Sequence, residues 1–553
     1  MFFSNLFRDN IKQSLTANPL DVLVIGGGIT GAGISMDAAT RGLKVGLLEM
    51  QDFAAGTSSR STKLIHGGLR YLKQLHIGVV AEVGKERAIV YENGPHVTTP
   101  EWMLLPFYKD GTFSPLQANV GLRTYDFLAN VKKKERRKML NAKQALQKEP
   151  LIKQDNLIGA GFYVEYRTDD ARLTIEVLKK AIEYGANALN YIKVIGFIYK
   201  TDGQIEGVEV EDQLSGDQFQ IFANKVVNAA GPWVDTIREM DGSKQGKTLH
   251  LTKGVHLVFD RERFPLQQAV YFDAPDGRLL FAIPRDGKTY VGTTDTSYEG
   301  DIAHPQVTVK DRDYVVDAIN YLFPSLGIQA DDVESSWAGL RPLIWEEGKS
   351  PGEISRKDEL FLSKSGLMSV AGGKLTGYRK MAEETVDMIV KKLKDEVGIL
   401  YSGSETKHIP ISGGIVGGAA GFAEFQKEKL QDAINQGIGE RDAKVLIQTY
   451  GTNVDKLFDH YLNLHNEALE AEIDPVVFAM LRYAIDDECI YTPSDFFIRR
   501  TAALYFDIAW VKKQQIKVID YMAKLFKWDQ EYVSFYKREL EVLLHEAVHP
   551  VED

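Results

Sequence analysis

The chain has 553 residues, of which 44% are hydrophobic and 26% charged, an ordinary balance for a soluble globular protein of about two to four domains. Its formal net charge of −11 argues against general binding to nucleic acid. The single cysteine, Cys489, excludes an internal disulfide, a CxxC redox pair and a cysteine zinc site. We therefore expect a protein of a reducing, cytoplasmic compartment, with no bound metal.

Residues 1–19 predict an amphipathic segment at the N-terminus. They lack the continuous apolar core of a signal peptide, and no run in the chain approaches the roughly 18–20 apolar residues of a membrane span. Apolar residues recur at every fourth position: Phe3, Phe7, Ile11 and Leu15. A helix with this face either lies on a membrane surface or packs on its own protein or a partner subunit. Packing is favoured, because only Arg8 and Lys12 supply positive charge.

A glycine-rich turn follows the first apolar run, in residues 21–31, DVLVIGGGITG. The run predicts a buried strand, and a helix follows the turn. Gly26 permits a tight turn, Gly28 lets the backbone approach a pyrophosphate, and Gly31 lets the helix pack on the strand. The helix N-terminus offers N–H groups to phosphates. Glu49 closes the next apolar run, where a carboxylate accepts hydrogen bonds from ribose hydroxyls. This combination predicts a dinucleotide-binding site.

The position of this unit favours FAD over a nicotinamide dinucleotide. It starts about 20 residues into the chain, so the N-terminal unit is the cofactor unit. The stretch after Glu49, QDFAAGTSSRSTKLIHGGLRYL, is rich in Gly, Ser and Thr. Such a stretch suits a backbone that runs beside a long, extended cofactor. A nicotinamide cofactor remains the alternative from the residues alone.

The middle of the chain is mixed and then β-rich. Residues 78–92 predict a helix, and Asp169 or Asp170 caps another. The run KKKERRK at 132–138 is either a contact for anionic lipid or a solvated helix face, and the solvated face is favoured. Strand-like segments follow at 189–199, 205–211, 217–229, 254–259, 278–284 and 288–294.

A second glycine-rich junction lies at 372–377, between a strand ending at Ala371 and a helix reaching about Leu393. It places another positive helix end near a ligand, where it can stabilise negative charge on a reduced flavin. Residues 402–421 are rich in Gly and Ser and predict a linker. From 422 to 550 the pattern is helical, which predicts a separate domain.

Eight stretches follow one another in the chain from residue 20 to about 385: VLVIGGGITGAGISMDAATRGLKVGLLE, TSSRSTKLIHGGLRYL, YRTDDARL, NAAGPWVD, KGVHLVF, VGTTDT, GLRPL and AGGKLTGYRKMAE. Taken together and in this order, they resemble the FAD-dependent (aerobic) glycerol-3-phosphate dehydrogenases. The resemblance implies an α/β fold with a glycine-oxidase-like, Rossmann-type FAD domain, an inserted β-rich substrate domain and a C-terminal all-α domain. We expect the FAD domain at 20–95, 155–235 and 360–396, the substrate domain at 96–154 and 236–359, a linker at 397–421 and the helical domain at 422–553.

The resemblance also implies the site residues. His256 is the preferred proton acceptor or hydroxyl orienter, and Arg341 is expected to bind the substrate phosphate. The remaining substrate-binding residues are Arg70, Tyr71, Arg356 and Lys374. The expected cofactor-binding residues are Gly26, Gly28, Ile29, Thr30, Gly31, Glu49, Thr57, Ser58, His66, Gly67, Gly68, Ala230, Gly231, Trp233, Gly373, Lys374, Leu375 and Thr376.

The activity implied is oxidation of sn-glycerol 3-phosphate at C2 to dihydroxyacetone phosphate, with hydride transfer to FAD and electrons passed to a quinone. This chemistry needs a base near the hydroxyl and cations near the phosphate. The alternatives are a glycerol-3-phosphate oxidase that reduces oxygen, an amine or amino-acid oxidase of the same fold, and a flavin-binding protein without turnover. Use of a quinone predicts loose contact with the inner face of the cell membrane. The helical domain is expected to mediate either self-association, as in a homodimer, or contact with another partner.

Overall fold

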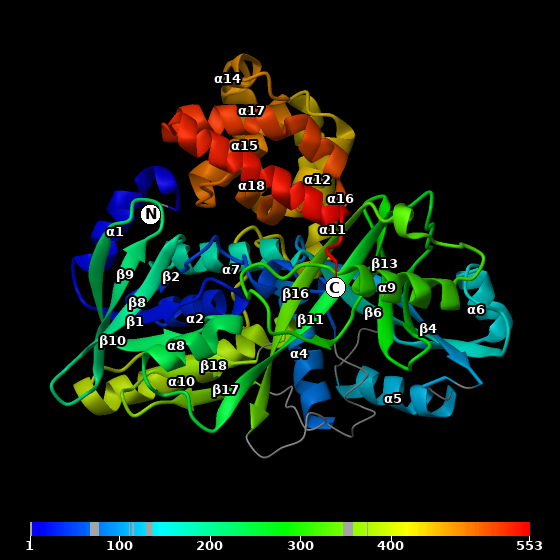
Figure 1. The fold of residues 1–553 in the computed structure, drawn as a ribbon, viewed down its shortest axis with the longest axis horizontal. Coiled ribbons are helices and arrows are strands. Elements are labelled where there is room, and N and C mark those ends of the chain that lie inside the picture. The colour runs from blue at the N-terminus through cyan, green and yellow to red at the C-terminus, as the bar shows by residue number, and fades with distance from the viewer. Residues whose placement is uncertain are drawn as a thin grey trace.

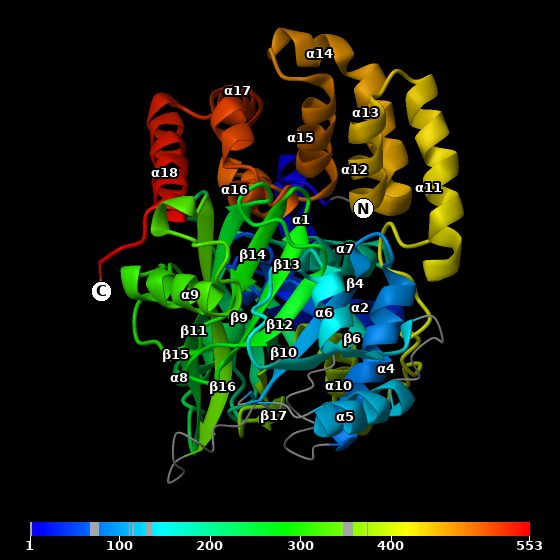
Figure 2. The same cartoon turned by 90° about the vertical axis from the view of Figure 1, so that its right-hand side faces the viewer.

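The computed structural model describes residues 3–66, 77–109, 111–112, 115–128, 135–346, 358–372 and 374–552. Two sheets lie side by side and form an α/β body, and the C-terminal helices stand together on one side of it (Figures 1 and 2). The predicted architecture, with a Rossmann-type sheet, a β-rich part and a C-terminal helical domain, is confirmed.

The first sheet contains the predicted β–α–β unit. Its main path runs β17 (Glu359–Leu362), β18 (Met368–Ala371), β10 (Gln218–Asn228), β1 (Leu20–Ile25), β2 (Val45–Leu48) and β7 (Asn187–Leu189), and β9 (Ile205–Asp212) joins β10 to β8 (Ile192–Tyr199). β1 pairs in parallel with both β2 and β10. These strands read as continuous apolar runs because both faces of a parallel sheet are covered. The covering helices include α2 (Ile29–Thr40), α7 (Asp170–Glu183) and α10 (Tyr378–Val397), with α2 packed against the other two.

The glycine-rich turn between β1 and α2 needs glycine for two different reasons. Gly26 has φ +110°, and a Cβ there would come within 2.5 Å of the Ala229 carbonyl oxygen. A Cβ on Gly31 would overlap the Gly26 carbonyl oxygen itself. The first turn of α2 therefore lies directly against the end of β1, which aims the helix N-terminus past the sheet edge.

The second sheet is mostly antiparallel. It runs β15 (Thr296–Ser297), β11 (Lys247–Asp260), β14 (Lys288–Gly292), β13 (Leu279–Arg285), β12 (Ala269–Asp273), β4 (Thr98–Tyr108), β6 (Leu157–Thr168) and β3 (Leu64–Ile65), with β16 (Ser335–Glu346) on β11 and β5 (Lys138–Asn141) on β6. β6 was expected in the FAD domain but pairs with β4 and β5 here. Its apolar run predicts a strand without specifying the sheet, because a local apolar pattern does not indicate which strands it pairs with.

Further helices border the two sheets. They are η2 (Thr57–Ser59), α4 (Ile77–Asn93), α5 (Pro115–Leu128), α6 (Ala142–Lys148), η4 (Gly231–Trp233), α8 (Val234–Met240), α9 (Val309–Leu322), η5 (Ala330–Asp332) and η7 (Leu375–Gly377). The predicted cap of α7 is Asp169, whose carboxylate accepts a hydrogen bond from the Arg172 N–H at 3.0 Å.

The C-terminal helices form a domain packed around two apolar cores. They are α11 (Gly418–Asn435), α12 (Glu440–Tyr450), η8 (Gly451–Asn453), α13 (Val454–Asn463), α14 (His465–Glu470), α15 (Pro475–Asp487), the π-helix η9 (Asp495–Arg500), α16 (Ala503–Phe506), α17 (Ile508–Phe526) and α18 (Gln530–Val548). One core is continuous with the second sheet, because α16 and α18 pack on β16. Figure 2 shows these helices above the body.

The N-terminal segment forms η1 (Asn5–Phe7) and α1 (Arg8–Thr16) and packs on its own protein. Ile11 and Leu15 are buried in a core with strands of the first sheet. The positive charges of Arg8 and Lys12 both pair with buried Asp212. Ile11 and Leu15 of the predicted apolar face therefore pack on the protein itself, while Phe7 of that face and its neighbour Leu6 are exposed. None of the helices in the described part of the chain combines the length and hydrophobicity of a transmembrane span.

Candidate active site

A cavity of about 1240 Å³ lies where the two sheets meet. It exceeds the roughly 300–1,000 Å³ of typical small-molecule pockets, as a dinucleotide requires. Expected cofactor residues on its wall are Gly26, Gly28, Ile29, Thr30, Glu49, Thr57, Ser58, His66, Ala230, Gly231, Trp233, Lys374, Leu375 and Thr376. Gly31 is not on the wall but packs behind it. Gly67, Gly68, Arg70, Tyr71, Arg356 and Gly373 lie outside the described residues.

The glycine-rich turn is tied to Glu49 at one end of this cavity. The Gly27 N–H donates to one Glu49 carboxylate oxygen at 2.7 Å, and the Gln51 N–H donates to the other at 2.8 Å. Burial raises the pKa of the Glu49 carboxyl, although these hydrogen bonds oppose the shift. The Ile29 N–H at the start of α2 donates to the Ser58 hydroxyl at 3.0 Å. This end has the parts that hold the ribose and phosphates of a dinucleotide.

His256 lies at the other end, on β11. Its Nε2 is 3.0 Å from the Thr62 hydroxyl, and its ring stacks on Trp337 with centroids 4.7 Å apart. Gly292, on the neighbouring strand β14, leaves room for the His256 ring, because a Cβ at this position would overlap the imidazole. Burial, with smaller contributions from the charges of Arg341 and Lys63, lowers the pKa of His256 well below its usual value. The imidazole is therefore neutral near pH 7, with one unprotonated ring nitrogen.

Arg341 projects from β16 to the same region of the cavity. Its guanidinium donates to the Thr293 hydroxyl at 2.7 Å and to the Thr294 carbonyl at 3.0 Å. It lies over Gly254, where a Cβ would overlap it. Gly254 and His256 lie on one face of β11, two residues apart, which is roughly 7 Å along a strand. The guanidinium of Arg341 and the neutral imidazole of His256 thus line the same part of the cavity.

The second glycine-rich junction closes the cavity from the first sheet. Lys374 precedes η7, and Leu375 and Thr376 belong to it. The Thr376 hydroxyl donates to the His66 carbonyl at 3.3 Å, which joins this junction to the end of β3. Burial lowers the pKa of the His66 imidazole, so this ring also lies neutral in the cavity wall.

Sequence reasoning missed the supports of His256. Thr62 is a wall residue that bonds the imidazole, and Trp337 stacks behind it. Tyr505 and Phe506 of the C-terminal domain pack on Trp337, with ring centroids 5.2 Å and 5.7 Å away. No local pattern predicts these contacts, since they join residues far apart in the chain. Of these residues, only Thr62 lies in a stretch that carries the family resemblance, TSSRSTKLIHGGLRYL.

Comparison with known proteins agrees with this geometry. The family model for FAD dependent oxidoreductases matches residues 21–379, and the model for the C-terminal domain of alpha-glycerophosphate oxidase matches 404–533. The aerobic glycerol-3-phosphate dehydrogenase of Bacillus subtilis (strain 168) is 58% identical over 550 residues, covering 100% of this chain and 99% of the relative. That of Staphylococcus aureus (strain USA300) is 54% identical over 552 residues, covering 99% and 98%.

Solved structures show the same relationship. The glycerol-3-phosphate dehydrogenase of Bacillus halodurans, complexed with FAD, has a TM-score of 0.87 and 49% identity, covering 100% of this chain and 99% of that one. The L-alpha-glycerophosphate oxidase of Mycoplasma pneumoniae with FAD bound shares the fold, with a TM-score of 0.55 and 17% identity over 70% of this chain and 97% of that one. FAD is the cofactor whose site the cavity forms. The chain belongs to the family of FAD-dependent glycerol-3-phosphate dehydrogenases.

Proposed function

We propose that this protein oxidises sn-glycerol 3-phosphate at C2 to dihydroxyacetone phosphate, with FAD as the hydride acceptor and a quinone as the final electron acceptor. The observation that supports the substrate is the pairing of Arg341 with neutral His256 across Gly254. The Arg341 guanidinium lies over Gly254, two residues along β11 from His256, and this arrangement suits a substrate that carries a hydroxyl on one carbon and a phosphate on the next. The relatives named above as glycerol-3-phosphate dehydrogenases support the same assignment.

The chain's own groups divide the work. Bound FAD supplies the hydride acceptor at flavin N5. His256 takes the hydroxyl proton on its unprotonated ring nitrogen, while the Thr62 hydroxyl and the Trp337 stack hold the ring in place. Arg341 binds the phosphate through charge-assisted hydrogen bonds. A dianionic phosphate beside His256 raises its low pKa toward the working pH, which makes it a better base in the complex than in the free protein.

Four further residues are expected to contact the substrate. Lys374, on the cavity wall, adds positive charge for the phosphate. Arg356 assists Arg341, and Arg70 and Tyr71 line the pocket beside the flavin. These three lie outside the described residues and remain predictions from the resemblance.

The electron acceptor and the cellular location form a separate part of this proposal. A quinone dissolves in lipid, so its use implies loose contact with the inner face of the cell membrane. Ile11 and Leu15 of α1 are buried and do not provide that contact, whereas Leu6 and Phe7 just before α1 are exposed. The basic run at 132–138 lies partly outside the described residues. Peroxide yield measured beside quinone turnover separates this acceptor from oxygen, and an equimolar yield of peroxide would establish the oxidase instead.

The test of the substrate is the visible spectrum of the purified holoenzyme, followed without oxygen. Bleaching of the oxidised-flavin bands by glycerol 3-phosphate, but not by glycerol or amino acids, is expected. Bleaching by amino acids would replace the proposal with an amine oxidase. A flavin spectrum that no addition of glycerol 3-phosphate bleaches would leave the cofactor in place and overturn the substrate.

A further inference from the structure

A loop between the first sheet and the C-terminal domain has one face on the cofactor cavity. This loop, residues 50–56, begins directly after Glu49. Met50, Gln51, Ala55 and Gly56 lie on the cavity wall. Asp52 points the other way, with its side chain fully buried. The loop is therefore a thin wall whose position decides how closely the cavity encloses its ligand.

The loop is joined to the dinucleotide motif through Gly27. The Ala54 N–H donates to the Gly27 carbonyl at 3.0 Å, and the Phe53 ring lies so close that a Cβ on Gly27 would be 2.6 Å from it. The Gly27 N–H in turn donates to Glu49. Ala54 itself has φ 65°, a left-handed conformation that costs free energy and persists only where surrounding contacts enforce it. The loop thus needs an anchor on its outer side.

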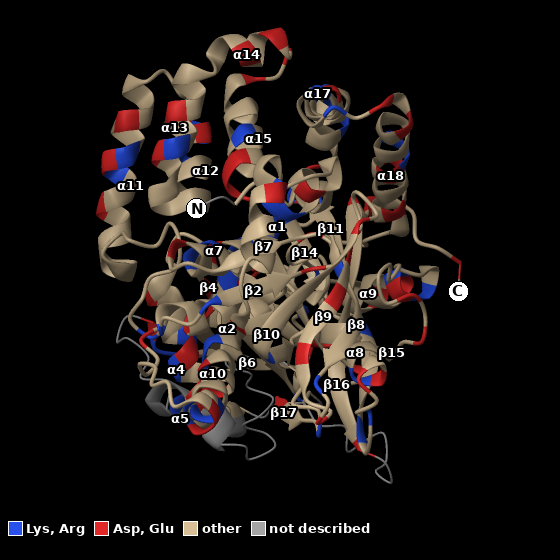
Figure 3. Cartoon of the chain, turned by 90° about the vertical axis from the view of Figure 1, so that its left-hand side faces the viewer, with Lys and Arg blue, Asp and Glu red and all other residues tan. Residues whose placement is uncertain are grey.

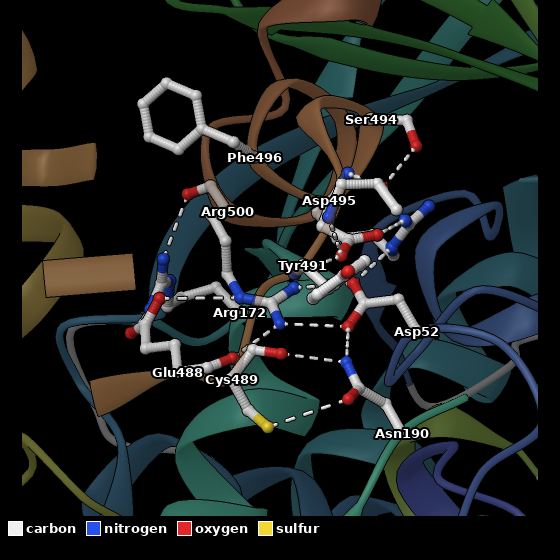
Figure 4. Close-up of polar contacts among 12 residues, drawn as sticks. Asp52, Arg172, Asn190, Glu488, Cys489, Tyr491, Ser494, Asp495, Phe496 and Arg500 are labelled. Carbon is white, nitrogen blue, oxygen red and sulfur yellow. Dashed lines mark hydrogen bonds and ion pairs between the residues drawn. The ribbon is translucent and has the colours of Figure 1, made fainter. Parts of the chain in front are cut away.

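The C-terminal domain supplies that anchor. Asp52 accepts hydrogen bonds from Arg499 Nε at 2.6 Å and from Arg500 Nη1 and Nη2 at 2.8 and 3.1 Å. Asn190 Nδ2 donates to the same carboxylate at 3.0 Å. Figure 4 shows Asp52 between Arg500 and Asn190, beneath the coil that carries Phe496. Burial opposes ionisation of Asp52, but the two guanidiniums outweigh it and hold its pKa below the usual value.

Both arginines come from η9, a π-helix. Segments of this kind are rare in proteins overall, but those that occur are often at functional sites. Successive residues there reach one carboxylate, although 447 and 448 residues separate them from Asp52. Charged segments of both signs gather where the C-terminal helices meet the body (Figure 3). The cluster continues through Glu488, which pairs with Arg172 and Lys179 of α7.

We propose that Arg499 and Arg500 are positioning residues that hold the 50–56 loop closed on the cavity, so that the C-terminal domain retains FAD. When Asp52 is no longer held by the two arginines, the backbone at Ala54 can relax. The 50–56 loop then moves away from Glu49 and the glycine-rich turn. The open state of the loop binds FAD less tightly, so the apparent affinity for FAD falls as the open state becomes more populated. This inference concerns the cofactor and is independent of the proposed substrate.

The experiment measures FAD release from diluted full-length holoenzyme, without substrate, as the rise of free flavin fluorescence. Arg500→Met removes two hydrogen bonds to Asp52, and Arg500→Lys keeps the charge but loses the two-pronged geometry. Should the first variant fail to fold, the second carries the test. The matched control is Lys179→Met, which removes a buried cation of the same interface that bonds Glu176, Glu488 and Tyr483.

We expect FAD release about ten-fold faster or more in the Arg500 variants, with a smaller increase for lysine than for methionine. Lys179→Met is expected to lower the melting temperature while releasing FAD at the wild-type rate. Release within about two-fold of wild type in the Arg500 variants would overturn the proposal. Equally fast release from Lys179→Met would also overturn it, because the effect would then follow domain stability and not the loop. Neither outcome depends on bleaching by glycerol 3-phosphate.

Discussion

Replacement of Arg341 by methionine tests the proposed phosphate clamp most directly. The guanidinium is fixed by Thr293 and the Thr294 carbonyl, and its side chain is 28% exposed, so solvent screens it only partly. Methionine keeps most of the apolar length and removes the charge. We therefore expect the fold and the FAD content to be unchanged.

The magnitude follows from this partial burial. Losing one partner of a buried, hydrogen-bonded charge pair costs about 2–5 kcal/mol, and we take about 2–4 kcal/mol for a side chain with this exposure. At about 1.4 kcal/mol for each factor of ten, kcat/KM should fall roughly 30- to 700-fold. Most of the loss should be in KM, since the phosphate is bound in both the ground state and the transition state.

The assay is steady-state reduction of an artificial electron acceptor over a range of glycerol 3-phosphate concentrations. The control is Arg278→Met, which removes another arginine of the cavity wall, one that pairs with Asp276 and has a 42% exposed side chain. We expect it to change kcat/KM by less than about three-fold. Unchanged kinetics in the Arg341 variant, or equal losses in both variants, would refute the clamp.

Three further predictions concern single side chains. His256→Asn should lower kcat by about 10²–10⁴-fold with little change in KM, and a pure KM effect in the same assay would demote His256 to an orienting role. Gly31→Ala places a methyl group onto the Gly26 carbonyl oxygen, so the flavin-to-protein absorbance ratio should fall and overpacking should cost about 1–3 kcal/mol in denaturant unfolding. Burial lowers the pKa of His96 from 6.5 to about 3, so the unfolded chain takes up a proton between these values that the folded protein does not. Stability should therefore fall by up to about 1.4 kcal/mol per pH unit below 6.5, and His96→Asn should flatten this part of the curve; equal slopes would contradict it.

The local parts of the fold could be predicted because their signals are short-range. The apolar run before Gly26, the glycine spacing and Glu49 lie within about 30 residues, and the β–α–β unit forms as expected. Asp169 caps α7 because its carboxylate accepts a hydrogen bond from one of the free N–H groups at the start of the helix. This interaction involves only neighbouring residues, so it can be predicted from the local sequence. The helical periodicity after residue 422 likewise indicated a separate domain.

Long-range pairing could not be predicted in the same way. The apolar pattern of β6 is compatible with either sheet, and only its register with β4 and β5 assigns it to the second. His256 on an apolar strand resembles an ordinary core histidine until Thr62 and Trp337 are seen around it. The buried pairing of Asp52 with Arg499 and Arg500 has no sequence signal at all.

By itself, the sequence determined that the cofactor is a dinucleotide, because the glycine turn and the acid follow from local geometry and residue type, while the resemblance to a known family supplied FAD and the candidate substrate residues. The tertiary structure decided which of these residues share one cavity. It also decided that the C-terminal domain is attached to the cofactor loop, through the pairing of Asp52 with Arg499 and Arg500. The physical reason is that burial and electrostatic pairing depend on distance in space, and a chain of 553 residues brings together groups that its order keeps far apart.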